Sequence, residues 1–218
     1  MTNYEIREKA RRDLGGKLFG AKWMNALAAA LIYSLLLGAI SAIPYVGQVA
    51  SLLLAGPLLF GITGYFLKLS RNTEPATIEG LFDGFNDFTE LFLLNLIMGL
   101  YIFLWSLLFI IPGIIKTYAY SMAFYIKRDN PTYGWKQCLD ESQRLMDGHK
   151  GELFCLHLSF IGWALLCVLT LGIGTLWLQP YMMASEANFY ASIAGEPIAQ
   201  SEPASEEPMN TNTFENLR

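Results

Sequence analysis

Long stretches without charged side chains constrain the fold of this chain most strongly. Two stretches carry no Asp, Glu, Lys or Arg and two carry only one, namely residues 24–43, 46–67, 91–126 (Lys116) and 153–193 (Glu186). A helix needs about 20 residues to cross the hydrocarbon core, so each of the two longer stretches can cross twice. Charged residues make up 16% of the chain, whereas about 25% is usual in soluble domains. The pattern indicates an integral membrane protein.

Proline and glycine divide these stretches into hairpins, at Pro44, at residues 112–113 and at residues 171–174. We therefore predict an all-α membrane protein with six transmembrane helices in three hairpins. The predicted spans cover about residues 24–43, 46–67, 91–111, 113–128, 153–171 and 174–193. The fourth span is the shortest, because its uncharged part gives a helix of only about 20 Å. It either extends through Lys127, crosses a thinned bilayer, or enters the bilayer without crossing it.

The basic residues predict the orientation. With six spans, every Lys and Arg except Lys116 lies on one side of the membrane. Because Lys and Arg accumulate in cytoplasmic segments, we expect both termini to be cytoplasmic. The long basic segment before the first span is not typical of a cleavable signal peptide. The segment 196–218 is rich in Pro, Ser and Glu, so we expect a disordered acidic tail after a single membrane domain at residues 1–195.

The same order of features recurs three times. A turn with Asp and Gly precedes a Leu-Phe or Glu-Leu-Phe motif before each hairpin, and each second helix ends in an aromatic pair: residues 65–66, 124–125 and 189–190. This order predicts a threefold internal repeat, although aromatic belts and Gly/Pro turns also occur in any hairpin bundle. Each hairpin follows an amphipathic cytoplasmic connector, at about residues 3–14, 77–92 and 133–148. The first is basic and suits a membrane surface, while the acidic second one favours packing against protein.

Several motifs resemble one known family. They are IREKARRDLG at 6–15, LWSLLFIIPGIIK at 104–116, SQRLMDGHK at 142–150, LHLSFIGW at 156–163 and TLGIG at 170–174. Together they resemble the DUF975 integral membrane proteins over about residues 5–195. The resemblance implies a multi-pass protein of the bacterial cytoplasmic membrane and no established activity. A looser likeness exists to the membrane domains of some glycerophosphodiester phosphodiesterases, but these residues contain no counterpart of the catalytic domain.

Three polar residues at similar depth form a candidate site within the membrane: Glu186, His157 and Asn95. An ionised carboxylate in hydrocarbon is costly, so Glu186 should face the bundle interior, water or a partner. One interpretation is a cluster that binds a headgroup, a cation or a proton. The alternative is an interhelical hydrogen-bond clamp without a ligand.

Basic residues near the predicted membrane surfaces are candidate headgroup contacts. They are Arg7, Arg11, Lys116, Arg144, His149 and Lys150. We expect Lys116, close to the 112–113 turn, to reach the phosphates of the outer leaflet, because long cationic side chains extend towards the interface. The cluster at residues 144–150 could bind a headgroup or remain solvated.

The sequence contains little that indicates catalysis. Three Cys without C-x-x-C spacing and two His disfavour a metal site, and no nucleotide-binding or hydrolase motif is present, so we expect neither cofactor nor enzyme activity. The net charge of −4 disfavours a nucleic-acid partner. We favour a protein that binds lipid or a membrane-protein partner, as a scaffold or envelope-homeostasis factor. A small transporter that uses Glu186 is the alternative, and a membrane enzyme ranks third.

Overall fold

The computed structural model describes residues 2–15, 20–43, 46–72, 76–170, 172 and 174–195, and these ranges contain helices and turns but no strand. The helices are α1 (Asn3–Asp13), α2 (Ala21–Ser41), α3 (Val46–Arg71), the 3-10 helix η1 (Ile78–Phe85), α4 (Phe88–Leu108), α5 (Ile110–Tyr120), α6 (Ala123–Asp129), α7 (Trp135–Leu145), α8 (Lys150–Leu169) and α9 (Thr175–Ile193). The all-α prediction is confirmed. The predicted turn at Pro44, the first Leu-Phe motif and the tail at 196–218 lie outside the described residues.

Within the described residues, four helices are long and apolar enough to cross a membrane. They are Ala21–Ser41, Gly47–Arg71, Phe88–Leu108 and Lys150–Val168. In the most apolar stretch of α4, only 11% of the residues are buried inside the protein, and Leu107 is 74% exposed. Exposed apolar surface of this extent is unfavourable in water and favourable in lipid. The helices therefore indicate membrane association, with four candidate spans in the part of the chain that the structure describes.

The predicted fourth span is not one continuous helix. The chain leaves the helical conformation at Phe109, which is extended (φ −156°, ψ 141°), and α5 then carries Pro112 in its first turn, where proline is tolerated. Eleven residues give α5 a length of about 16 Å, and α6 adds only seven residues after a break at Ser121–Met122. Because of this break, the predicted fourth span consists of two short helices and not of one helix of spanning length.

The predicted sixth span forms a complete helix, α9, but in a different environment from the candidate spans. Its residues 184, 185 and 187–191 are buried, and it contacts α1, α2, α3 and α8. Because other helices shield α9, its surface need not be strongly apolar. This shielding accounts for the buried Ser185 and Asn188 within one membrane-length helix, whereas Glu186 is partly exposed.

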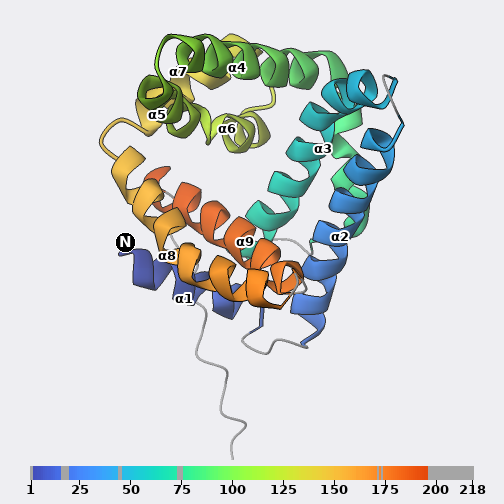
Figure 1. Ribbon diagram of the computed structural model, residues 1–218, viewed down its shortest axis with the longest axis vertical. Helices are drawn as coiled ribbons and strands as arrows, with labels where there is room; N and C mark the ends of the chain where they lie inside the picture. Colours follow the sequence, from blue (N-terminus) through green and yellow to red (C-terminus); the bar gives the residue numbers. More distant parts are fainter. Residues whose placement is uncertain are drawn as a thin grey trace, which may run out of the picture.

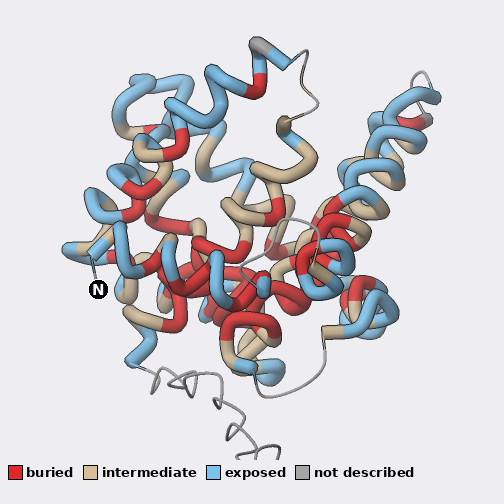
Figure 2. Tube along the Cα trace, turned by 90° about the horizontal axis from the view of Figure 1, so that it is seen from below, coloured by how far each residue is buried: buried red, intermediate tan, exposed pale blue. Residues whose placement is uncertain are grey.

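The helices α4, α5 and α7 lie at one end of the molecule, and α1, α8 and α9 lie at the other (Figure 1). The buried residues gather in the middle, and exposed helix ends extend from it (Figure 2). The three predicted aromatic pairs lie in this core: Tyr65, Phe66, Phe124, Tyr125, Phe189 and Tyr190 are each at most 3% exposed. They pack against protein, so they do not form the interfacial belt of the alternative interpretation.

The connectors also pack against protein. In α1, the stripe of Ile6, Ala10 and Leu14 is at most 1% exposed and faces α9 rather than a membrane surface, which corrects the expectation of an interfacial helix. As its acidic character predicted, η1 packs against α3. A Cβ on Gly61 would lie 2.5 Å from the carbonyl carbon of Leu81, so glycine allows the two backbones to touch.

Candidate functional site

A chain of three polar side chains connects α5, α8 and α9. His157 Nε2 lies 2.8 Å from Glu186 Oε1, and His157 Nδ1 lies 3.3 Å from the hydroxyl of Tyr118. The side chains of His157 and Glu186 are 30% and 33% exposed. They are therefore accessible, although each belongs to a membrane-length helix. We call this set the Tyr118–His157–Glu186 chain.

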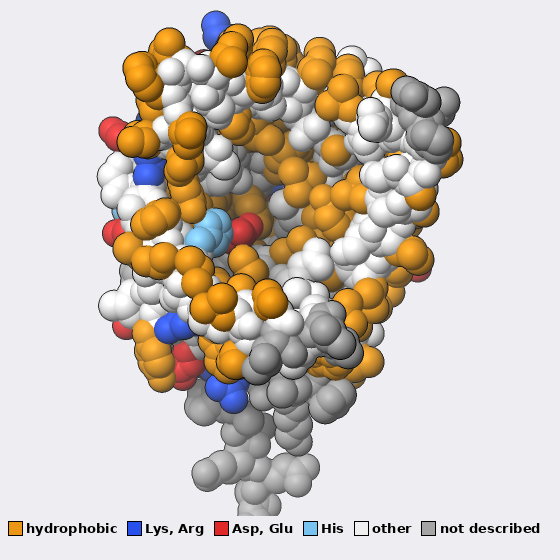
Figure 3. All heavy atoms as spheres, viewed as in Figure 1, with side chains coloured by type: hydrophobic (Ala, Val, Ile, Leu, Met, Phe, Trp, Pro, Cys, Tyr) orange, Lys and Arg blue, Asp and Glu red, His pale blue; other side chains and the backbone are white. Residues whose placement is uncertain are grey.

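The Tyr118–His157–Glu186 chain borders a pocket, to which Tyr118 and His157 contribute. The pocket has a volume of about 290 Å³ and is lined by Ile114, Thr117, Tyr118, Ser121 and His157. The space-filling view shows a broad hollow lined mainly by hydrophobic side chains, with a histidine and an acidic side chain next to each other at its edge (Figure 3). A polar centre inside an apolar hollow is the usual composition of a small-molecule site.

The third member of the predicted cluster lies elsewhere. Asn95 is on α4 and faces Gly56 of α3, where an added Cβ would lie 3.1 Å from the Asn95 Cβ. The structure therefore brings together Glu186 and His157 without Asn95. Tyr118 joins them instead, from the short helix α5, which the sequence analysis treated as part of a single fourth span.

Lys116 also has a different environment from the one expected. Its Nζ donates to Gln143 Oε1 of α7 at 2.7 Å and lies 5.6 Å and 5.5 Å from the ring centres of Trp105 and Tyr120. Gln143 belongs to a connector that we placed on the cytoplasmic side. A lysine at the outer surface could not reach a cytoplasmic Gln143. The outer position predicted for Lys116 and the cytoplasmic position predicted for the 133–148 connector therefore exclude each other.

The remaining candidate headgroup contacts have mixed surroundings. Three of them pair with acidic residues three positions away on the surface: Arg144 with Glu141, His149 with Glu152, and Lys150 with Asp147. Arg11 is exposed. Arg7 is half-buried beside α9, and its backbone carbonyl accepts from Tyr181 at 3.2 Å. Exposed pairs of this kind are weak, so the ion pairs leave Arg144, His149 and Lys150 accessible to anionic headgroups.

The comparisons with known proteins give one result. The family model described as "Protein of unknown function (DUF975)" matches residues 1–117 and 107–196. This chain belongs to the DUF975 family. Neither the curated proteins nor the solved structures contain a match.

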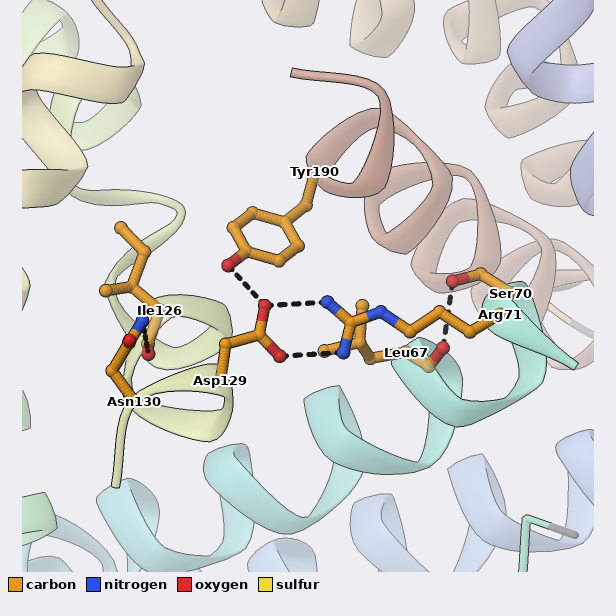
Figure 4. A network of polar contacts seen from close by, with 7 residues as sticks. All are labelled: Leu67, Ser70, Arg71, Ile126, Asp129, Asn130 and Tyr190. Atoms are coloured by element: carbon orange, nitrogen blue, oxygen red, sulfur yellow. Dashed lines mark hydrogen bonds and ion pairs between the residues drawn. The ribbon is translucent and has the colours of Figure 1, made fainter. Parts of the chain in front are cut away.

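The DUF975 chain also holds a polar network that the sequence analysis did not predict (Figure 4). Arg71, at the end of α3, donates two hydrogen bonds to Asp129 of α6, at 2.7 and 2.6 Å. The Tyr190 hydroxyl of α9 donates to the same carboxylate at 2.7 Å. The network joins the ends of three helices that sequence analysis assigned to three different hairpins. Only the tertiary fold brings these residues together.

A second polar contact of the DUF975 chain fastens α1 to α9. The Asn188 side chain donates to Asp13 Oδ2 at 2.8 Å, and Asp13 is only 5% exposed. Burial raises the pKa of Asp13 above 3.8, although the hydrogen bond from Asn188 and the charges of Lys9, Arg12 and Lys22 oppose the shift. The cost of burying the charged form therefore exceeds the gain from these partners.

This shift predicts a pH dependence of stability. An acid with a raised folded-state pKa binds more protons when folded, so the free energy of unfolding falls as the pH rises from 3.8 through the raised pKa, and then levels off. We expect Asp13→Asn to remove this fall. Thermal unfolding of both proteins in detergent, from about pH 4 to pH 8, measures it. The variant should gain stability relative to the wild type as the pH rises, and a relative loss would contradict the prediction.

Proposed function

We propose that this chain is a lipid-binding integral membrane protein that acts as a scaffold or envelope-homeostasis factor rather than as an enzyme. The observation that carries the proposal is the Tyr118–His157–Glu186 chain, which borders a pocket in an apolar hollow. A lipid offers the matching chemistry, since its acyl chains suit the hollow and its headgroup suits the polar chain. A protein partner in the same hollow is the alternative occupant.

The pocket allows a closely matched test. Ile114 lines the pocket and Ile115 does not, yet both are 49% exposed. The protein is extracted in mild detergent, and its bound lipids are quantified by mass spectrometry. We expect Ile114→Trp to reduce the bound lipid several-fold, because the indole fills part of the pocket, while Ile115→Trp retains it. Equal lipid content in both variants, or a wild type without lipid, would contradict the proposal.

We further propose six membrane-embedded segments in a threefold repeat, with both termini on the cytoplasmic side of the bacterial membrane. The 19 residues of α9 give a helix of about 28 Å. Both termini on one side require an even number of crossings, so in this proposal the α5–α6 segment crosses as two short helices rather than one long helix. The core contact of all three aromatic pairs supports the repeat.

The orientation predicts a simple labelling result. Tags placed at the two termini should both be protected from protease in intact spheroplasts and both become accessible after lysis. Digestion of either tag in intact spheroplasts would refute the proposed orientation.

A transporter is the second candidate, because the His157–Glu186 pair is partly exposed within membrane-length helices. Such pairs occur along ion and substrate pathways. In reconstituted vesicles, a transporter should lose substrate or proton flux in Glu186→Gln while remaining folded. Flux unchanged by this substitution would exclude a role of Glu186 in transport.

A further inference from the structure

We infer that the pocket beside Tyr118 selects a protonated primary amine on an apolar body, with Glu186, the hydrogen-bond partner of the pocket-lining His157, as the neighbouring anion. This inference rests on the proposed function, because it specifies the headgroup chemistry for the same pocket. The argument starts from the hydrogen-bonding capacity of the side chains around the pocket.

The two small hydroxyl groups in the pocket have already used their protons. Thr117 Oγ1 donates to the carbonyl oxygen of Gly113 at 3.0 Å, and Ser121 Oγ donates to the carbonyl oxygen of Tyr118 at 2.9 Å. A hydroxyl has one proton and two lone pairs. Both oxygens can therefore still accept a hydrogen bond, but neither has a proton left to donate.

The larger polar groups show the same preference. An ionised Glu186 can only accept, so His157 carries a proton on Nε2 to make the 2.8 Å contact. In the neutral imidazole, Nδ1 then accepts from the Tyr118 hydroxyl at 3.3 Å. The remaining lone pairs of Tyr118 and of the Glu186 carboxylate are free to accept from a ligand.

The lysine of α5 is directed away from this pocket. Thr117 and Tyr118 line the pocket, whereas the adjacent Lys116 has its Nζ on Gln143 of α7 and near Trp105 and Tyr120. None of the described residues that line the pocket is Lys or Arg. Glu186 has His157 as its hydrogen-bond partner, and a cationic ligand would add further charge compensation to a carboxylate within a membrane-length helix. A ligand with positive charge and N–H donors therefore fits this acceptor-rich site.

The amine could come from a lipid headgroup or from a free alkylamine. Purified protein in detergent is titrated with short-chain phosphatidylethanolamine, with phosphatidylcholine of the same chain length, and with hexylamine, and binding is followed by native mass spectrometry. Phosphatidylcholine carries the same charges but lacks N–H donors. We expect phosphatidylethanolamine to bind roughly 10-fold or more tightly than phosphatidylcholine, as for hydrogen bonds to charged groups. Hexylamine that competes identifies the ammonium alone as sufficient, and its failure to compete identifies the lipid headgroup as the source.

The variants have a matched control. Glu186→Gln should weaken phosphatidylethanolamine binding roughly 10- to 100-fold. Glu152→Gln, in the exposed His149–Glu152 pair with its contact of 2.9 Å, should leave it unchanged. If Glu186→Gln does not fold, Ile114→Trp tests the same pocket without touching the pair.

The outcomes separate the two proposals. Equal binding of the two lipids, or binding unaffected by both pocket variants, would overturn the amine inference while lipid binding stands. Absence of bound lipid of either class in the wild type would overturn the proposed function itself.

Discussion

Replacing Gly61 with alanine is expected to destabilise the protein by about 1–3 kcal/mol, the usual cost of overpacking a tight contact. The added Cβ would lie 2.5 Å from the carbonyl carbon and 2.8 Å from the Cα of Leu81. These are backbone atoms of η1, so no side-chain rotation can relieve the clash. The α3–η1 pair would have to separate. Thermal unfolding followed by size-exclusion chromatography in detergent measures the loss.

Gly99→Ala provides the control for this variant. Gly99 lies in α4, and an added Cβ there would meet no atom within 4 Å. Because alanine favours a helix by up to about 1 kcal/mol over glycine, this variant should be as stable as the wild type or more stable. If both variants unfold alike, the close approach of α3 and η1 does not limit stability.

The second large effect is expected for Asp129→Ala, which should lower the free energy of unfolding by about 2 kcal/mol. Two hydrogen bonds from Arg71 and one from Tyr190 end on the Asp129 carboxylate. Hydrogen bonds to charged groups contribute about 1.5–3 kcal/mol each. The total is reduced because the Arg71 and Asp129 side chains are 25% and 20% exposed, so solvent partly screens the pair.

A surface pair with the same chemistry provides the comparison. Arg144 also binds Glu141 through two nitrogens, with Nε 2.8 Å from Oε2, but Arg144 is 73% exposed. Glu141→Ala should therefore cost less than about 1 kcal/mol. A double-mutant cycle of Asp129→Ala with Tyr190→Phe measures the share of the tyrosine. Equal losses in the two alanine variants would show that Asp129 does not fasten the three helix ends.

Much of the fold could be predicted from hydropathy alone. In lipid, a long uncharged stretch forms a helix because the helix satisfies its own backbone hydrogen bonds. Accordingly, α2, α3, α4 and α8 begin and end within a few residues of the predicted spans. The fourth span was harder to predict, because its length depends on how α5 packs. Gly113 lies against Ser106 of α4, so α5 folds back along α4 rather than continuing as a longer helix.

The candidate site was predictable only in part. Glu186 and His157 were predicted to lie together because polar side chains within uncharged, membrane-length stretches usually pair with one another. In the structure, His157 Nε2 lies 2.8 Å from Glu186 Oε1. Asn95 had the same depth along its helix, but α4 directs it towards Gly56. The position of a residue along its helix sets only the depth of its side chain. Whether two side chains touch also depends on how each helix is rotated about its axis and on which helix lies beside it.

The sequence by itself determined the helical class, the apolar segments and the family, because these depend on residue types and their order along the chain. Only the tertiary structure decided that Tyr118 completes the polar chain, that Lys116 faces Gln143, and that Asp129 joins three helix ends. Each of these contacts connects helices that are distant in sequence, and no local pattern specifies how such helices rotate and pack. The acceptor-rich character of the pocket follows from that packing.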